Sequence, residues 1–126
     1  METVVQTWSI NQSTLSQQFT TIPCPEGYGV AGIAEIRLIG DKDFKITSSY
    51  HTVTISWSNS NSFWRLTSSL TFEDFTNPLS VALEVDVIFA KQTGYKVTGS
   101  NRNGTTFTYA LPYGVKHPAN TPIKFA

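Results

Sequence analysis

Apolar residues recur at every second position along most of this chain, and this alternation restricts its fold more than any other feature of the sequence. A clear run is Val81, Leu83, Val85, Val87 and Phe89, with other residues between them. Side chains along a β-strand point to opposite faces in turn, so an alternating strand buries one face. No stretch of about a dozen residues has apolar residues at helical spacing. The sequence therefore predicts an all-β protein with little or no helix.

Short polar segments separate the alternating stretches and supply the residues that tight turns need. Segments such as GDKD, SNSNS and NRNG are rich in Gly, Asn and Asp, which favour turns. Strands are predicted at 3–10, 15–22, 29–39, 43–50, 51–58, 63–72, 79–90, 94–99 and 104–111. A chain of 126 residues is long enough for one core. We expect a single-domain antiparallel β-sandwich, jelly-roll-like, with about eight to nine strands.

The last part of the chain differs from the rest because it contains three prolines, at positions 112, 118 and 122. Proline cannot donate to a strand ladder and is excluded from central strands. We therefore assign residues 1–111 to the sandwich domain. Residues 112–126 are expected to form an extended tail that packs on the same domain or on a neighbouring one.

The segment ISWSNSNSFWRL, residues 55–66, has the pattern of a β-hairpin with a four-residue loop. In that register Ser58 pairs with Phe63, and Trp57 lies opposite Trp64. Both indoles then share a face with the neighbouring apolar side chains, so we predict that they pack at one end of the core. The alternative is that the two rings form an exposed platform for a ligand.

The opposite face of this hairpin carries hydroxyl groups and almost no charge. From residue 47 to residue 72 the only formal charge is Arg65, with His51 as a possible second. Natural proteins usually protect such β-prone surfaces with lysines, prolines or bulges, or cover them. We therefore predict an interface with other copies of the chain, formed by Thr52, Thr54, Ser56, Ser58, Thr67, Ser69 and Thr71. The alternative is a solvated face without a partner.

Composition restricts the location and the partners of the chain. Nine Lys and Arg balance nine Asp and Glu, charged residues make up only 14%, and no basic patch favours nucleic acid. No apolar stretch is long enough to span a membrane, and the first residues do not have the pattern of a signal peptide. Cys24 is the one cysteine, so an intrachain disulfide is excluded. We expect a soluble cytoplasmic protein that does not insert into membranes.

The stretch GYGVAG, residues 27–32, matches the dinucleotide-binding pattern G-x-G-x-x-G. That motif requires a strand before the glycines and a helix after them, whose amino end holds the pyrophosphate. Here a predicted strand follows the glycines instead. We therefore interpret these glycines as part of a turn and a β-bulge at the start of that strand.

The stretch LEVDVIF, residues 83–89, places Glu84 and Asp86 on one face of a strand. It resembles part of the carboxylate strand of jelly-roll glucanases, in which a further glutamate follows. Phe89 and Ala90 occupy the positions where that third carboxylate is expected. The resemblance covers about six residues and would imply glycoside hydrolysis by a carboxylate pair. The alternative is an exposed acidic stripe on the outer face of the strand.

Taken as a whole, these features predict a non-enzymatic structural protein that assembles in many copies, such as a viral or phage capsid or tail component. Its expected partners are further copies of the chain or other subunits of the particle, and its final location would then be the virion. No catalytic residue, cofactor or metal site is expected, because His51, His117 and Cys24 belong to no cluster with ligand spacing.

A carbohydrate-binding module or lectin, for example one that binds a receptor, is the second hypothesis. Sugar sites combine an exposed aromatic ring with polar side chains that bond to hydroxyl groups. The candidate ligand-binding residues lie in two polar loops and beside them: Asn59, Asn61, Phe63, Arg65, Asn101, Arg102 and Asn103. Glycans would be the partners in that case.

Overall fold

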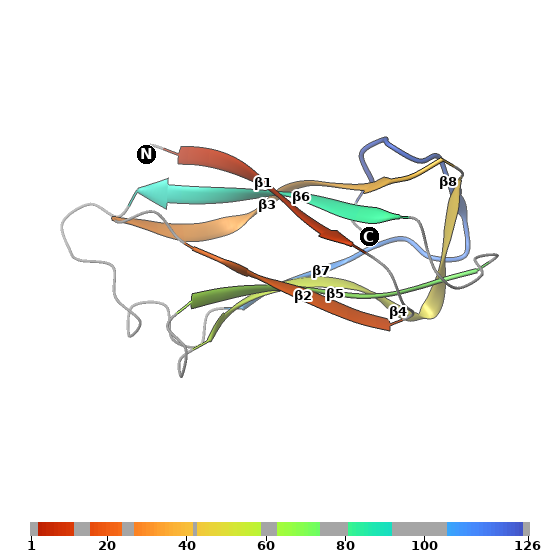
Figure 1. Ribbon diagram of the computed structural model, residues 1–126, viewed down its shortest axis with the longest axis horizontal. Coiled ribbons are helices and arrows are strands. Elements are labelled where there is room, and N and C mark those ends of the chain that lie inside the picture. Colours follow the sequence, from red (N-terminus) through yellow and green to blue (C-terminus); the bar gives the residue numbers. More distant parts are fainter. Residues whose placement is uncertain are drawn as a thin grey trace.

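Two antiparallel β-sheets face each other in the computed structural model of this chain (Figure 1). The structure describes residues 3–11, 16–23, 27–41, 43–58, 63–73, 81–91 and 106–124. Among these residues there are eight strands and no helix, and hence no helix that could span a membrane. The expected all-β architecture with two sheets is confirmed, whereas the jelly-roll connectivity stays a prediction.

Each sheet combines strands that are far apart in the sequence. The three-stranded sheet has the order β1 (Thr3–Asn11), β6 (Ala82–Lys91), β3 (Tyr28–Ile39). The five-stranded sheet contains β2 (Ser16–Ile22), β5 (Phe63–Phe72), β4 (Phe44–Ser58) and β7 (Thr106–Ala110) in this order, and β8 (Lys116–His117) pairs with the start of β4. The strand predicted at 94–99 lies outside the described residues.

The core lies between the two sheets and is built by alternate residues of each strand. In β5 the buried side chains are Trp64, Leu66, Ser68, Leu70 and Phe72, and in β6 they are Leu83, Val85, Val87, Phe89 and Ala90. Burying one such apolar side chain stabilises the fold by about 1.5–3 kcal/mol. Ser68 is the polar exception, and its Oγ donates to the backbone oxygen of Gln18 (3.5 Å).

The tryptophan hairpin has the predicted register. Ser58 pairs with Phe63, and Trp57 lies opposite Trp64. The two indoles meet edge to face with ring centres 5.7 Å apart. Trp64 is only 1% exposed, and Trp57 is half-buried against the same core. The prediction that both rings point inward is confirmed, and the alternative of an exposed tryptophan platform is wrong.

The prediction of separate strands at 43–50 and 51–58 is wrong, because β4 is continuous over fifteen residues. Its pairing with β5 shifts register between Ile46 and His51, and this irregularity interrupts the alternation that the prediction relied on. Figure 1 shows β4 passing from β8, beside the three-stranded sheet, down to the five-stranded sheet. A bend of this kind lets one strand form a corner between two sheets.

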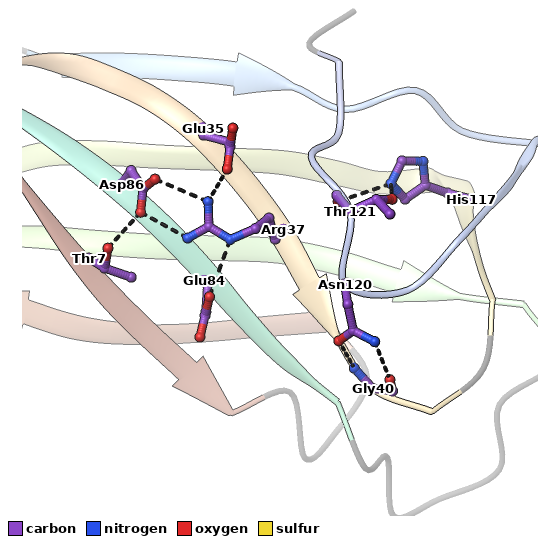
Figure 2. A network of polar contacts seen from close by, with 9 residues as sticks. All are labelled: Thr7, Glu35, Arg37, Gly40, Glu84, Asp86, His117, Asn120 and Thr121. Atoms are coloured by element: carbon purple, nitrogen blue, oxygen red, sulfur yellow. Dashed lines mark hydrogen bonds and ion pairs between the residues drawn. The ribbon is translucent and has the colours of Figure 1, made fainter.

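The C-terminal segment covers the edge of β3 that β6 leaves open. Backbone N–H groups of Asn120 and Ile123 donate to the carbonyl oxygens of Leu38 (2.8 Å) and Ile36 (2.9 Å). The Asn120 side chain also donates to Gly40 O (2.9 Å) and accepts from Gly40 N (3.2 Å) (Figure 2). Residues 112–124 therefore lie along their own sandwich and complete one of its sides.

A tyrosine links the two sheets on this same side. The backbone N–H of Ile33 in β3 donates to Tyr109 Oη from β7 at 2.8 Å. Gly32 makes this approach possible, because its φ is +146° and a Cβ there would lie 2.6 Å from the hydroxyl. The β3–β6 register shifts on both sides of this point. The predicted bulge is confirmed at Gly32, whereas Gly29 keeps regular pairing with Ala90.

Replacing Tyr109 by Phe should lower the free energy of unfolding by about 1–3 kcal/mol, because the buried N–H of Ile33 loses its acceptor. Urea unfolding followed by tryptophan fluorescence measures this change. The control is Tyr113→Phe, at a residue that is 50% exposed, and it should change stability by less than about 0.5 kcal/mol. A Tyr109→Phe protein as stable as the wild type would contradict the proposed role of this hydrogen bond.

Candidate functional site

The outer face of the five-stranded sheet presents hydroxyl groups in rows. Thr54 in β4 lies opposite Thr67 in β5 on one side and opposite Thr108 in β7 on the other. Two residues away along β4, Thr52 pairs with Ser69 and Ala110, and Ser56 pairs with Arg65 and Thr106. We call this surface the hydroxyl face, and it comprises Thr52, Thr54, Ser56, Thr67, Ser69, Thr71, Thr106 and Thr108.

Sheet geometry fixes the spacing of these hydroxyl groups. Neighbouring strands lie about 4.8 Å apart, and alternate residues of one strand are separated by roughly 6.8 Å. Thr54 Oγ1 donates to Thr108 Oγ1 at 3.3 Å, and the hydroxyls of Thr47 and Thr71 also contact each other. A hydroxyl can donate one hydrogen bond and accept two, so the face retains capacity for water or for a polar partner.

Six of the predicted interface residues share the hydroxyl face. Thr52, Thr54, Ser56, Thr67, Ser69 and Thr71 are all half-buried among their neighbours. The side chain of Ser58 lies outside the described residues. Figure 1 shows no described element on the outer side of the five-stranded sheet. The surface is therefore open in a single chain, as far as the described residues extend.

Arg65 lies at one end of the hydroxyl face between two phenylalanines. Its guanidinium carbon lies 4.7 Å from the ring centre of Phe19 and 6.0 Å from that of Phe63. Such cation–π contacts contribute about 0.5–1 kcal/mol at exposed sites. Arg65 Nε is buried and has no hydrogen-bond partner among the described residues. The structure thus combines an aromatic surface with an unsatisfied cationic donor.

Phe19 is the member of this group that sequence reasoning missed. It is 59% exposed on β2 and is paired with Thr67 across the β2–β5 ladder. The alternation of the strand indicates its orientation. Ile22 points inward, and Phe19 lies an odd number of positions away, so its side chain points to the outer face. Phe63 and Arg65 were predicted. The other predicted ligand-binding residues, Asn59, Asn61, Asn101, Arg102 and Asn103, lie outside the described residues.

On the outer face of the three-stranded sheet, Arg37 forms ion pairs with three carboxylates (Figure 2). We call Arg37, Glu35, Glu84 and Asp86 the Arg37 cluster. Its Nη1 and Nη2 donate to the two oxygens of Asp86 (3.0 and 2.9 Å), and its Nε donates to Glu84 (3.2 Å). Glu35 forms a further ion pair with Nη1. Thr7 Oγ1 donates to Asp86 Oδ1 at 2.7 Å. Arg37 and Thr7 thus engage both oxygens of Asp86.

Arg37 and Asp86 shift each other's pKa. Hydrogen bonds from Arg37 hold the pKa of Asp86 below its usual value, although burial partly opposes them. The pKa of the guanidinium is raised, first by its hydrogen bond to Asp86. Asp86 is therefore an ionised partner of Arg37 at neutral pH, and Glu84 forms a further ion pair with the same guanidinium. This arrangement corrects the interpretation of these residues as a simple exposed acidic stripe.

Glu84 and Asp86 both bond to the guanidinium of Arg37. A carboxylate pair in a glycosidase needs one member that donates a proton, and the hydrogen bonds from Arg37 disfavour that role for Asp86 because they hold its pKa low. Among the described residues, no group of three or more His, Cys, Asp or Glu side chains could hold a metal ion. The cluster therefore has the features of a structural ion-pair network.

Comparisons with protein families, with curated proteins and with solved structures found no match for this chain. Function must therefore be inferred from the two outer faces themselves.

Replacing Asp86 by Asn should lower the free energy of unfolding by roughly 1–3 kcal/mol at pH 7, because charged hydrogen bonds to Arg37 are lost. A carboxyl whose pKa is lowered by folding stabilises the protein above its unfolded pKa of about 3.9. That contribution disappears as the pH falls through the folded pKa of Asp86, so the two proteins should converge in acid.

Urea unfolding of both proteins between pH 7 and pH 3 measures this convergence. The control is Asp43→Asn, at an exposed residue outside the cluster, which should leave stability within about 0.5 kcal/mol of the wild type at pH 7. A difference between wild type and Asp86→Asn that stays constant over this pH range would contradict the ionised Asp86–Arg37 pair as its source.

Proposed function

We propose that this chain is a non-enzymatic structural subunit that works in many copies, and that other copies cover its hydroxyl face. The observation that carries the proposal is the nearly uncharged surface of β5, β4 and β7, which no described element of the chain covers. A viral or phage capsid or tail is the kind of particle in which we expect such a subunit.

Physical chemistry supports a covering partner for this surface. Strands with hydroxyl side chains and no charges lack the electrostatic repulsion that keeps sheets apart in solution. Two such faces can exchange hydrogen bonds with water for hydrogen bonds with each other, at little net cost.

The Arg37 cluster supports a structural function in a different way. A salt bridge network with half-buried members stabilises one arrangement of the β1, β6 and β3 strands. Its carboxylates are committed to Arg37 and Thr7, which favours a scaffold over a catalyst.

Replacing Thr54 by Lys places a charge at the centre of the hydroxyl face and should weaken assembly at least tenfold, because an unpaired charge in an interface is costly. Analytical ultracentrifugation of wild type and variant from low to high micromolar concentration measures this change. The control is Val115→Lys, at a residue that is 57% exposed in the C-terminal segment, and it should assemble like the wild type. A wild-type chain that stays monomeric at all these concentrations would contradict the proposal.

A carbohydrate-binding function is the second candidate, and the group formed by Phe19, Arg65 and Phe63 favours it. The exposed ring of Phe19 is available for the apolar face of a sugar. Arg65 and the hydroxyl of Thr21, which pairs with Arg65 across the strands, are suited to bond to sugar hydroxyl groups. The two candidates use adjoining parts of the same sheet.

A glycan array with the wild type and the variants Phe19→Ala and Arg65→Ala tests the second candidate. A sugar that stacks on Phe19 should lose at least about fivefold in affinity in either variant, since stacking and one charged hydrogen bond each contribute about 1 kcal/mol or more. Thr108→Ala serves as the control, because Thr108 lies at the far side of the sheet. No binding of any glycan by the wild type would exclude this function.

A further inference from the structure

The two long sides of the sandwich differ in how they are closed. On the side of β3 and β7, the C-terminal segment bonds to the backbone of β3, and Tyr109 bridges the sheets. On the other side β1 ends the three-stranded sheet and β2 ends the five-stranded sheet, each paired on one side only among the described strands. β1 and β2 contact each other across the two sheets. Among the described residues, both sheets therefore have an open edge on the same side.

The sequence of this open side has none of the usual protection against edge pairing. From Thr3 to Ile22 the chain contains no Asp, Glu, Lys, Arg or Pro. β1 pairs with β6 over all nine of its residues without a register shift, so no bulge twists its edge away. Val5 points out of the sheet from this strand and is 54% exposed. Long, flat, uncharged edge strands are templates for another strand.

We propose that a second copy of this chain docks edge to edge on the β1–β2 side. β1 of one copy pairs antiparallel with β1 of the other about a two-fold axis that runs through both sheets. The two β2 strands then come side by side beneath them, so that both sheets continue across the dimer. The inference rests on the proposed self-association and names a contact for it that is distinct from the hydroxyl face.

A second copy fits this side better than an unrelated partner. A two-fold axis places the same surface on both subunits, and an antiparallel pair of identical strands satisfies that symmetry. Both open edges belong to one molecule and lie on one side, so a copy presents the two matching edges at once. A single extended peptide would occupy only one of them.

The other edges of the sandwich are less suited to this contact. The C-terminal segment already occupies the free edge of β3 through its hydrogen bonds to Ile36 and Leu38. β7 offers only five residues, compared with nine in β1. Backbone hydrogen bonds to the partner scale with strand length, so β1 provides the more extensive ladder.

Val5→Lys tests this contact, because a lysine on an edge strand is the device by which natural proteins prevent pairing. Val115→Lys makes the same change at a similarly exposed valine in the C-terminal segment. Val5→Thr keeps the position uncharged and β-prone. Sedimentation should show at least a tenfold higher dimer dissociation constant for Val5→Lys, and values near the wild type for Val115→Lys and Val5→Thr. Circular dichroism and urea unfolding of each variant establish that it is folded.

Hydrogen exchange of the full-length wild type supplies a second readout. Amide exchange in β1 and β2 should slow as the protein concentration rises, and this dependence should be lost in Val5→Lys. An assembly that Thr54→Lys disrupts and Val5→Lys leaves intact would overturn the edge contact while preserving the proposed function. A wild-type chain that remains monomeric would overturn both, and an assembly insensitive to Thr54→Lys but lost in Val5→Lys would support the edge contact alone.

Discussion

Each strand of this sandwich can turn only every second side chain toward the core, and the other features of the molecule depend on this constraint. Leu83, Val85 and Val87 of β6 are fully buried, which forces Glu84 and Asp86 to the outside. In β5 the same rule buries Trp64 and Leu66 and leaves Arg65 and Thr67 outside. The composition of the outer faces is thus determined by the residues that remain between the core positions.

The two outer faces are chemically unlike. The three-stranded sheet concentrates charge around Arg37, where three carboxylates and one guanidinium form a closed set of ion pairs. The hydroxyl face has neutral hydrogen-bonding groups and Arg65 at one end. A charged face keeps its hydration when copies meet, since desolvating ion pairs is costly. A hydroxyl face loses much less, and this difference gives the molecule one face that remains in water and one that tolerates a partner.

Alternation alone was sufficient to predict the fold class and the register of the tryptophan hairpin, because Trp57 and Trp64 follow from counting through a four-residue loop. It failed in β4, where the shift between Ile46 and His51 imitates a turn. It also gave no indication that Arg37 would form ion pairs with Glu84 and Asp86, because β3 and β6 become neighbours only in the folded sheet. Pairings between strands distant in sequence depend on topology, which local periodicity does not specify. Phe19, by contrast, lies on the outer face that the alternation itself indicates.

The asymmetry between the two sides of the sandwich bears on how such a chain avoids uncontrolled aggregation. Among the described residues, the tail occupies the β3 edge, and the longer open edges, those of β1 and β2, lie on the other side. An isologous contact buries these edges of both subunits. Association through them therefore ends at the dimer, because no copy of that surface remains exposed. Growth beyond the dimer must then use a different surface, and the hydroxyl face is available for it. In the proposed assembly the edge contact stops at the dimer, so an ordered particle would need the hydroxyl face as a second, separate contact.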